Sequence, residues 1–299
     1  MLPEATARAL ALDDEAEIEP RLAVLRRQLG SAALSEYAFA NLYLFRTAHA
    51  YRYLPGPYPC VSGLTYDGVR HLLPLFDLAA APAAAMAQLL ADHHCFFPLA
   101  AATVARLDPA LYNWTALPED ADYLYPAENF RDYRGDSLRK KRGQLRQLLA
   151  AHGVVCQPLD AARRSDALRV LQGWMQAKGK GRGEADEAAC GEALHLAQRF
   201  ALDGEIYYAG DQPIGFLLAQ SLAPGLVVMR FAKGDDAYPG IYPYMFHDFC
   251  LRRAGRVDWL NFEQDLGLAN FRKTKRSYRP SAQLAKFRVH VGAGGDQGR

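Results

Sequence analysis

The order in which helical and strand-like segments alternate is the most constraining feature of this chain, because both halves repeat it. In the first half, apolar residues at helical spacing over 36–47 precede two strand-like segments around Gly68 and an alanine-rich helix over 80–92. In the second half, a helix is predicted from Asp136, and paired strands are predicted on either side of Gly210. This repeated order predicts a mixed α/β fold and suggests two domains related by duplication.

The length of the chain agrees with two domains. Its 299 residues suffice for two domains of ordinary size, each with a core of its own, and the composition is that of a folded globular protein. We expect an N-terminal domain over 20–134 and a C-terminal domain over 135–290 that carries the active site. Residues 1–19 and 291–299 are expected to be flexible tails.

Cysteine usage and hydropathy indicate the compartment. The five cysteines are scattered and form no C-x-x-C pair, which argues against a disulfide framework or a zinc site. The first residues lack the pattern of a secretory signal, and Asp77 and Pro82 interrupt the longest apolar window. We therefore expect a cytoplasmic protein with no integral membrane segment, no metal and no tightly bound cofactor.

Positive charge is concentrated in two segments, although the net charge of the chain is only +2. Residues 131–146 carry a net charge of +5, and residues 271–288 carry +7 without a single acid. Two such segments on an otherwise acidic chain favour a localised anion site. The alternative is that both segments are solvated helix faces.

The helix predicted from Asp136 places a cation on its apolar stripe. By helical spacing, Lys141 or Arg142 lies between Leu138 and Leu145. A cation there must extend to solvent along its own stem, pair with an acid, or meet a ligand anion. Phosphates suit the last possibility, so Lys141 and Arg142 are candidate substrate-binding residues.

A second candidate is the stretch "RFAKGDDAYPGIYPYMF", which reads as a strand, a turn and a helix. The start of such a helix offers unpaired N–H groups and a partial positive charge to a phosphate or carboxylate. Tyr238 and Gly240, in the turn, are therefore candidate substrate-binding residues. The turn lacks a glycine-rich repeat, and an ordinary strand-to-helix connection remains the alternative.

A third candidate is the stretch "NFEQDLGLANFRKTKRSYRP", which places two acids directly before a group of cations. If the strand expected before it extends this far, alternation puts Glu263 and Asp265 on one face. Two adjacent carboxylates repel, so one keeps its proton more easily unless a cation compensates, and such a group can act as a base. The alternative is a structural acid–base cluster that holds the last helix on the sheet.

The pattern N-x-E-Q-D-L-G-L-x-x-F-R-K-x-K-x-S-Y-x-P within this stretch resembles the C-terminal catalytic domain of the phosphatidylglycerol lysyltransferases. The segments "YPGIY" and "LRKKRGQLRQLLA" strengthen the resemblance, which covers about residues 30–290. It implies two tandem domains of the GCN5-related N-acetyltransferase (GNAT) type, each with a mixed, mostly antiparallel sheet flanked by helices. It also implies that an aminoacyl group moves from a charged tRNA to a nucleophile.

The resemblance to this family implies functional roles for individual residues of this chain. By this resemblance, Glu263 or Asp265 would act as base or orient the nucleophile. Lys275 and Arg272 would stabilise the developing oxyanion or hold donor phosphates. The matching positions are Glu263, Asp265, Arg272, Lys275 and Ser277, with Lys141 and Arg142 in the basic helix.

We therefore expect an acyltransferase or aminoacyltransferase that acts on an amine or hydroxyl of a small molecule, a peptide or a lipid headgroup. Aminoacyl-tRNA is the expected donor, because two basic segments exceed what one pyrophosphate needs. One alternative is an acyl-CoA-dependent N-acyltransferase, although the turn before Gly240 departs from the usual acetyl-CoA loop. The other is a non-catalytic protein that binds nucleic acid or another anion on the same scaffold.

Overall fold

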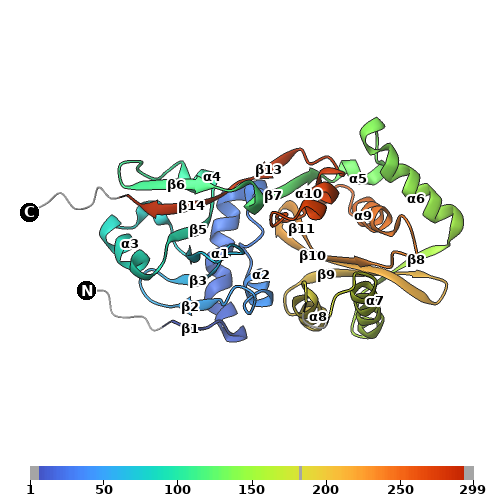
Figure 1. The fold of residues 1–299 in the computed structure, drawn as a ribbon, viewed down its shortest axis with the longest axis horizontal. Helices are drawn as coiled ribbons and strands as arrows, with labels where there is room; N and C mark the ends of the chain where they lie inside the picture. The colour runs from blue at the N-terminus through green and yellow to red at the C-terminus, as the bar shows by residue number, and fades with distance from the viewer. Residues whose placement is uncertain (1–6, 182–183, 293–299) are drawn as a thin grey trace, which may run out of the picture. The chain divides into compact units, whose positions relative to one another are not determined.

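The computed structural model describes residues 7–181 and 184–292, which form two compact units with a seven-stranded sheet each (Figure 1). The first unit contains the chain up to Asp122 and two later segments, Gln264–Leu268 and the part from Gln283 onward. The second unit contains Tyr123–Glu263 and Ala269–Ala282.

The sheet of the first unit has the strand order β1-β2-β3-β4-β5-β14-β6. Its ladders are antiparallel except for the β4–β5 pair. The predicted hairpin turn lies between β3 and β4, where Gly68 has a φ of 80°. The strands are β1 (Arg8–Ala9), β2 (Arg52–Leu54), β3 (Cys60–Leu64), β4 (Arg70–Pro74), β5 (Cys95–Ala100), β6 (Tyr112–Ala116) and β14 (Lys286–Val291). The helices are α1 (Glu15–Leu29), α2 (Phe39–Leu44), α3 (Ala83–Leu89) and α4 (Ala101–Val104).

The sheet of the second unit has the strand order β13-β7-β12-β11-β10-β9-β8. Its β11–β12 pair is parallel, and the ladders from β11 to β8 and between β12 and β7 are antiparallel. The strands are β7 (Asp122–Pro126), β8 (Val154–Pro158), β9 (Leu202–Ala209), β10 (Gln212–Ala223), β11 (Gly225–Gly234), β12 (Val257–Asn261) and β13 (Ala282–Leu284). The helices are α5 (Glu128–Asp132), α6 (Arg139–Ala151), α7 (Arg164–Ala177), α8 (Glu187–Leu196), α9 (Ile241–Arg252) and α10 (Ala269–Arg276).

Helices cover both faces of the second sheet. Helix α9, with α5 and α6 against it, lies on one face, and α7 and α8 lie on the other (Figure 1). Helix α9 approaches the sheet closely at Gly215, where a Cβ atom would lie 2.9 Å from the sulfur of Met245. A β-bulge next to Gly215 is present as a register shift between Pro213 and Gly215 in the β9–β10 hairpin. Together these elements position the start of α9 beside α6.

The two units do not follow the boundary expected between 134 and 135. Strand β7 precedes that boundary but belongs to the second sheet, and β14 lies in the first sheet between β5 and β6. The pairing register places β14 between β5 and β6, since Val289 pairs with both Phe96 and Trp114. Such long-range pairing leaves no local periodicity in the sequence.

The expectation of a flexible tail over 1–19 is wrong for residues 7–19, which the structure describes. Strand β1 pairs with β2, and α1 begins at Glu15 with Ile18 buried. The buried carboxylate of Asp14 accepts a hydrogen bond from the Ala11 amide at 2.8 Å and pairs with Arg8. Residues 1–6 and 293–299 lie outside the described part of the chain. Within 7–181 and 184–292, no helix combines the length and the apolar character needed to cross a bilayer.

Candidate functional site

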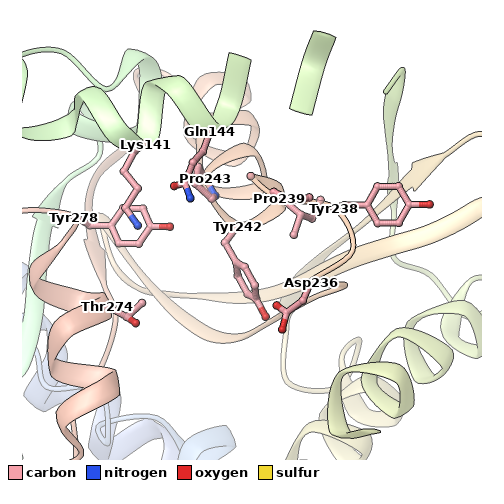
Figure 2. Close-up of a pocket in the computed structure, with 11 residues that line it drawn as sticks. Lys141, Gln144, Asp236, Tyr238, Pro239, Tyr242, Pro243, Thr274 and Tyr278 are labelled. Atoms are coloured by element: carbon pink, nitrogen blue, oxygen red, sulfur yellow. The ribbon is translucent and has the colours of Figure 1, made fainter. Parts of the chain in front are cut away.

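A pocket of about 250 Å³ opens in the second unit where α9 begins. Figure 2 shows its side chains, with Lys141 descending from α6 onto the ring of Tyr278. The pocket is lined by Lys141 and Gln144 of α6, by the residues 236–243 except Ala237, and by Thr274 and Tyr278.

The start of α9 contributes its own polarity to this pocket. The predicted strand, turn and helix are confirmed, since β11 ends at Gly234 and α9 begins at Ile241. The N-cap residue is Gly240, so no side chain caps the helix, and Pro243 in the first turn has no N–H. The positive end of the helix dipole therefore faces the pocket without a protein carboxylate at the cap.

Lys141 is the cation that the pocket holds. Its Nζ atom lies 3.8 Å from the ring centroid of Tyr278, a cation–π contact. Burial, with a smaller contribution from the charge of Lys140, lowers the pKa of Lys141 to about 8. No carboxylate in the described part of the chain forms an ion pair with Lys141. The sequence left three possibilities for this cation: extension to solvent, pairing with an acid, or contact with a ligand anion. Pairing with an acid is excluded within the described residues.

We expect Lys141 to react as a neutral amine at lower pH than an exposed lysine does. Its rate of acylation by a succinimidyl ester should level off above about pH 8, because the ammonium form is then largely lost. The rate for exposed Lys140 should keep rising toward about pH 10. Peptide mass spectrometry after short pulses of reagent measures both rates in one sample. A rate for Lys141 that tracks that of Lys140 would contradict the lowered pKa.

Tyr278 brings a hydroxyl group to the pocket. The side chain is 3 % exposed, and its hydroxyl has no hydrogen-bond partner among the described residues. In Figure 2 this hydroxyl points into the pocket, toward the side from which Tyr242 enters. Burial raises the pKa of Tyr278, so the phenol stays protonated and can donate a hydrogen bond. The hydroxyl of Tyr242, in contrast, already accepts one from the Gly234 amide at 3.1 Å.

The pocket brings together three residues that the sequence singled out: Lys141, Tyr238 and Gly240. The ring of Tyr238 also contacts that of His152, with 4.9 Å between centroids. Arg142 has a different environment, because its guanidinium donates to the backbone carbonyls of Tyr133 and Gly135. It holds the chain before α6, and it does not line this pocket.

The predicted pair of acids is not arranged as expected. Strand β12 ends at Asn261, and Glu263 has a φ of 56°, so the chain leaves the sheet before the two carboxylates can share a strand face. The Glu263 carboxylate accepts a hydrogen bond from the buried guanidinium of Arg230 at 2.6 Å. Asp265 belongs to the first unit, where its buried carboxylate accepts a hydrogen bond from the Gly267 amide at 2.9 Å.

The predicted residues of α10 and its C-terminal end stabilise the turn that follows β12. The Lys275 ammonium donates to the backbone carbonyl of Phe262 and, at 3.1 Å, to that of Glu263. The Ser277 hydroxyl donates to the Thr274 carbonyl at 2.6 Å. Arg272 is half-buried in α10. These contacts agree with the structural alternative for this segment, and the catalytic and binding roles of the predicted residues stay predictions.

Part of the positive charge counted in the second basic segment is neutralised inside the first unit. Lys286 is buried and pairs with Glu36 and Asp122. Arg288 pairs with Asp67 at 2.7 Å and with Asp120 at 2.9 Å. These two cations contribute to folding, and they are not available to an anionic ligand as the charge count suggested.

Among the pocket residues with polar side chains, five were not predicted as site residues from the sequence: Gln144, Asp236, Tyr242, Thr274 and Tyr278. A signal for Tyr278 was present, because it follows Ser277 directly in the motif that carries the family resemblance. Tyr242 likewise lies in the quoted segment "YPGIY". Gln144 and Thr274 had no signal, since their place in the pocket depends on how α6 and α10 pack.

Another cluster has the composition of a metal site. Ligand atoms of Cys156, Glu205 and Asp248 lie within 4.8 Å of one another. The guanidinium of Arg252 lies among them, at 2.6 Å from Glu205 and 2.9 Å from Asp248, and it donates to the Cys156 sulfur. Because Arg252 already supplies the positive charge, the cluster is satisfied as an ion-pair network.

The two mixed sheets with helices on their faces confirm the predicted fold class, two tandem mixed α/β domains, and FemX shares this fold. The chain belongs to the family described as phosphatidylglycerol lysyltransferase, C-terminal, whose model matches residues 27–290. Membership in this family supports a function of the acyl- or aminoacyl-transfer kind. The chain matches none of the curated proteins with which it was compared.

Solved structures share this fold over nearly the whole chain. A conserved protein of unknown function from Bacteroides thetaiotaomicron VPI-5482 is 18 % identical, with a TM-score of 0.79 over 98 % of this chain and 100 % of the other. L-PGS from Bacillus licheniformis is 13 % identical, with a TM-score of 0.59 over 91 % of each chain. FemX is 6 % identical, with a TM-score of 0.58 over 96 % of this chain and 97 % of the other. At these identities the likeness concerns the fold.

Proposed function

We propose that the protein transfers an aminoacyl group from aminoacyl-tRNA to an amine or hydroxyl acceptor, and that the pocket at α9 receives part of the substrate. One observation carries the proposal. In a chain of the lysyltransferase family, a half-buried lysine and an unpartnered tyrosine hydroxyl converge on an uncapped helix start. The basic residues of 131–146 and of 271–279 belong to this unit and agree with a polyanionic donor.

The reaction requires one bond exchange and one proton transfer. The acceptor oxygen or nitrogen attacks the ester carbonyl of the donor, and the bond from that carbon to the ribose oxygen then breaks. The acceptor proton passes to a base and from there to the leaving ribose oxygen. In this proposal Glu263 is the base, oriented by its 2.6 Å bond to Arg230, and Lys275 supplies positive charge near the oxyanion. As the family resemblance implies, Asp265 orients the nucleophile and Arg272 holds donor phosphates.

We expect the Glu263→Gln variant to lose at least about 100-fold in kcat/KM for transfer, because an amide cannot accept the acceptor proton. The measurement is product formation from labelled aminoacyl-tRNA. Glu128→Gln, which changes an exposed acid at the start of α5, should leave the rate unchanged. Thermal melting of both variants shows whether the loss of the Arg230 bond unfolds the protein. A well-folded Glu263→Gln protein with the wild-type rate would exclude Glu263 as the base.

The donor is identified by offering the protein each class of donor separately. The protein is incubated with labelled aminoacyl-tRNAs or labelled acyl-CoAs and a cell extract, and the mass of the labelled product identifies the acceptor. Product from aminoacyl-tRNA alone supports the proposal, and product from acyl-CoA alone would support the N-acyltransferase alternative. Binding of tRNA that weakens steeply with salt, without any product, would indicate the non-catalytic alternative.

A further inference from the structure

We infer that Gln264 is a positioning residue, which links the turn that carries Glu263 to the buried ammonium of Lys286 and so fixes where the Glu263 carboxylate lies. This role rests on the proposed function, in which Glu263 is the base, and it adds a residue that acts on the base. Gln264 directly follows Glu263 in the chain, and its side-chain oxygen accepts a hydrogen bond from Lys286 at 2.7 Å.

The ammonium of Lys286 has three N–H donors, and its three shortest contacts include Gln264. The other two are the carboxylates of Glu36 and Asp122, each at 2.6 Å, whereas the Ser35 hydroxyl lies further away at 3.3 Å. Both Lys286 and Asp122 are fully buried. A buried N–H donor that loses its acceptor is unfavourable, so Lys286 holds the Gln264 side chain in place.

The acids around Lys286 are themselves held by the protein. The Ser35 amide donates to one carboxylate oxygen of Asp122 at 2.8 Å, and the Ser35 hydroxyl donates to the other at 2.9 Å. These residues all belong to the first unit, as does Gln264. A buried polar network whose members satisfy one another is rigid, so Gln264 is attached to a fixed point.

The turn after β12 requires such support, because its backbone takes conformations that residues with side chains rarely adopt. The φ angle is 56° at Glu263 and 57° at Leu266, and residues of this kind persist only where their surroundings hold them. The Glu263 amide donates to the side-chain oxygen of Asn261 at 2.7 Å, and its carbonyl accepts from the Tyr123 amide at 3.2 Å. From this backbone the carboxylate reaches the buried guanidinium of Arg230 at 2.6 Å.

Lys286 joins two chain segments beside the place where their backbones pair. The Tyr123 amide and the Glu263 carbonyl form a backbone hydrogen bond. The chain neighbours of these two residues, Asp122 and Gln264, both bind the same ammonium. The ammonium therefore cross-links the start of β7 to the turn one residue beyond that bond. Without the Gln264 contact, the turn can open and carry the Glu263 carboxylate out of position.

Transfer by the Gln264→Leu variant tests this role, because leucine nearly keeps the size of the side chain and removes the acceptor. With labelled aminoacyl-tRNA and cell extract, we expect a rate ~10-fold or more below that of the wild type, since a small displacement of a base is costly. The loss should persist at saturating donor, because it concerns the position of the base and not binding. Gln264→Glu should stay within about 3-fold of the wild-type rate, since a carboxyl oxygen still accepts from the ammonium.

The matched control is Gln283→Leu, which makes the same chemical change at an exposed position of β13 and should leave the rate unchanged. Melting curves confirm that each variant is folded before rates are compared. A folded Gln264→Leu protein with the wild-type rate would overturn the inference. Equal losses in Gln264→Leu and Gln264→Glu would overturn it as well, because the acceptor oxygen would then not be what matters.

Hydrogen exchange of the full chain, followed by mass spectrometry, tests the same contact without any substrate. In Gln264→Leu the amides of Tyr123 and Glu263 should exchange ~10-fold faster, because the turn opens more often, and those of β10 should not change. Unchanged exchange at both amides would overturn the inference even if the rate fell.

The two readouts separate this role from the proposed function. Faster exchange in a chain that shows no transfer would refute the proposed function and support the link between Gln264 and Lys286. A rate that falls in Glu263→Gln but stays at the wild-type level in Gln264→Leu would refute the positioning role alone.

Discussion

Replacing Lys286 by methionine is expected to lower the free energy of unfolding by about 3–5 kcal/mol, the range for a buried ion pair that loses one partner. The Lys286 side chain is fully buried in the first unit, with its ammonium 2.6 Å from the carboxylates of both Glu36 and Asp122. It also donates to the side-chain carbonyl of Gln264 at 2.7 Å. Methionine would leave two buried carboxylates facing each other. Urea denaturation followed by circular dichroism measures the change.

The pH dependence of this variant gives a second readout. Burial raises the pKa of Glu36 even in the presence of Lys286, and removal of the ammonium should raise it further. A folded-state pKa above the unfolded value means that the folded protein binds more protons, so stability decreases as pH rises through this range. Lys286→Met should therefore be least destabilised near about pH 5 and most destabilised near about pH 8.

Lys273→Met is the control for the loss of a charge, because Lys273 is exposed on α10. Its effect on stability should stay within about 0.5 kcal/mol. If Lys286→Met unfolds at the same urea concentration as the wild type at both pH values, the buried charge cluster does not hold the first unit together.

Replacing Gly240 by alanine is expected to cost about 1–3 kcal/mol of stability and to distort the pocket. Gly240 has a φ of 102°, which a residue with a side chain rarely adopts. A Cβ atom would lie 2.3 Å from the backbone oxygen of Gln144 and 3.2 Å from the Cβ of Leu148. Helix α6 must therefore move away from the start of α9, and it carries Lys141 with it. Denaturation measures the stability, and the acylation rate of Lys141 measures the effect on the pocket.

Gly143→Ala is a matched control on α6. A Cβ atom at Gly143 would have no neighbour within 4 Å outside the helix, and its φ is not positive. Alanine there should stabilise the protein by about 0.5–1 kcal/mol, since it favours the helix. The interpretation of the α6–α9 contact would be wrong if both alanine variants had the same stability and the same acylation rate at Lys141.

The sequence by itself determined the elements whose signals are local. The hairpins at Gly68 and Gly210 and the helix that begins just before Pro243 were all predictable. Turn chemistry and apolar periodicity act within a few residues, so they can be read without knowledge of the rest of the fold. The family motif, which also lies in one short stretch, was sufficient for the fold class.

Tertiary structure alone decided which residues meet. Strand periodicity suggested that Glu263 and Asp265 share a face, but the chain leaves the sheet after Asn261 and the two acids find separate partners. Lys286 looked like part of an exposed basic segment, yet the insertion of β14 into the first sheet buries it. The contact of Lys141 with Tyr278 joins α6 to the end of α10. Packing across long sequence separations fixes such contacts, and no local pattern encodes them.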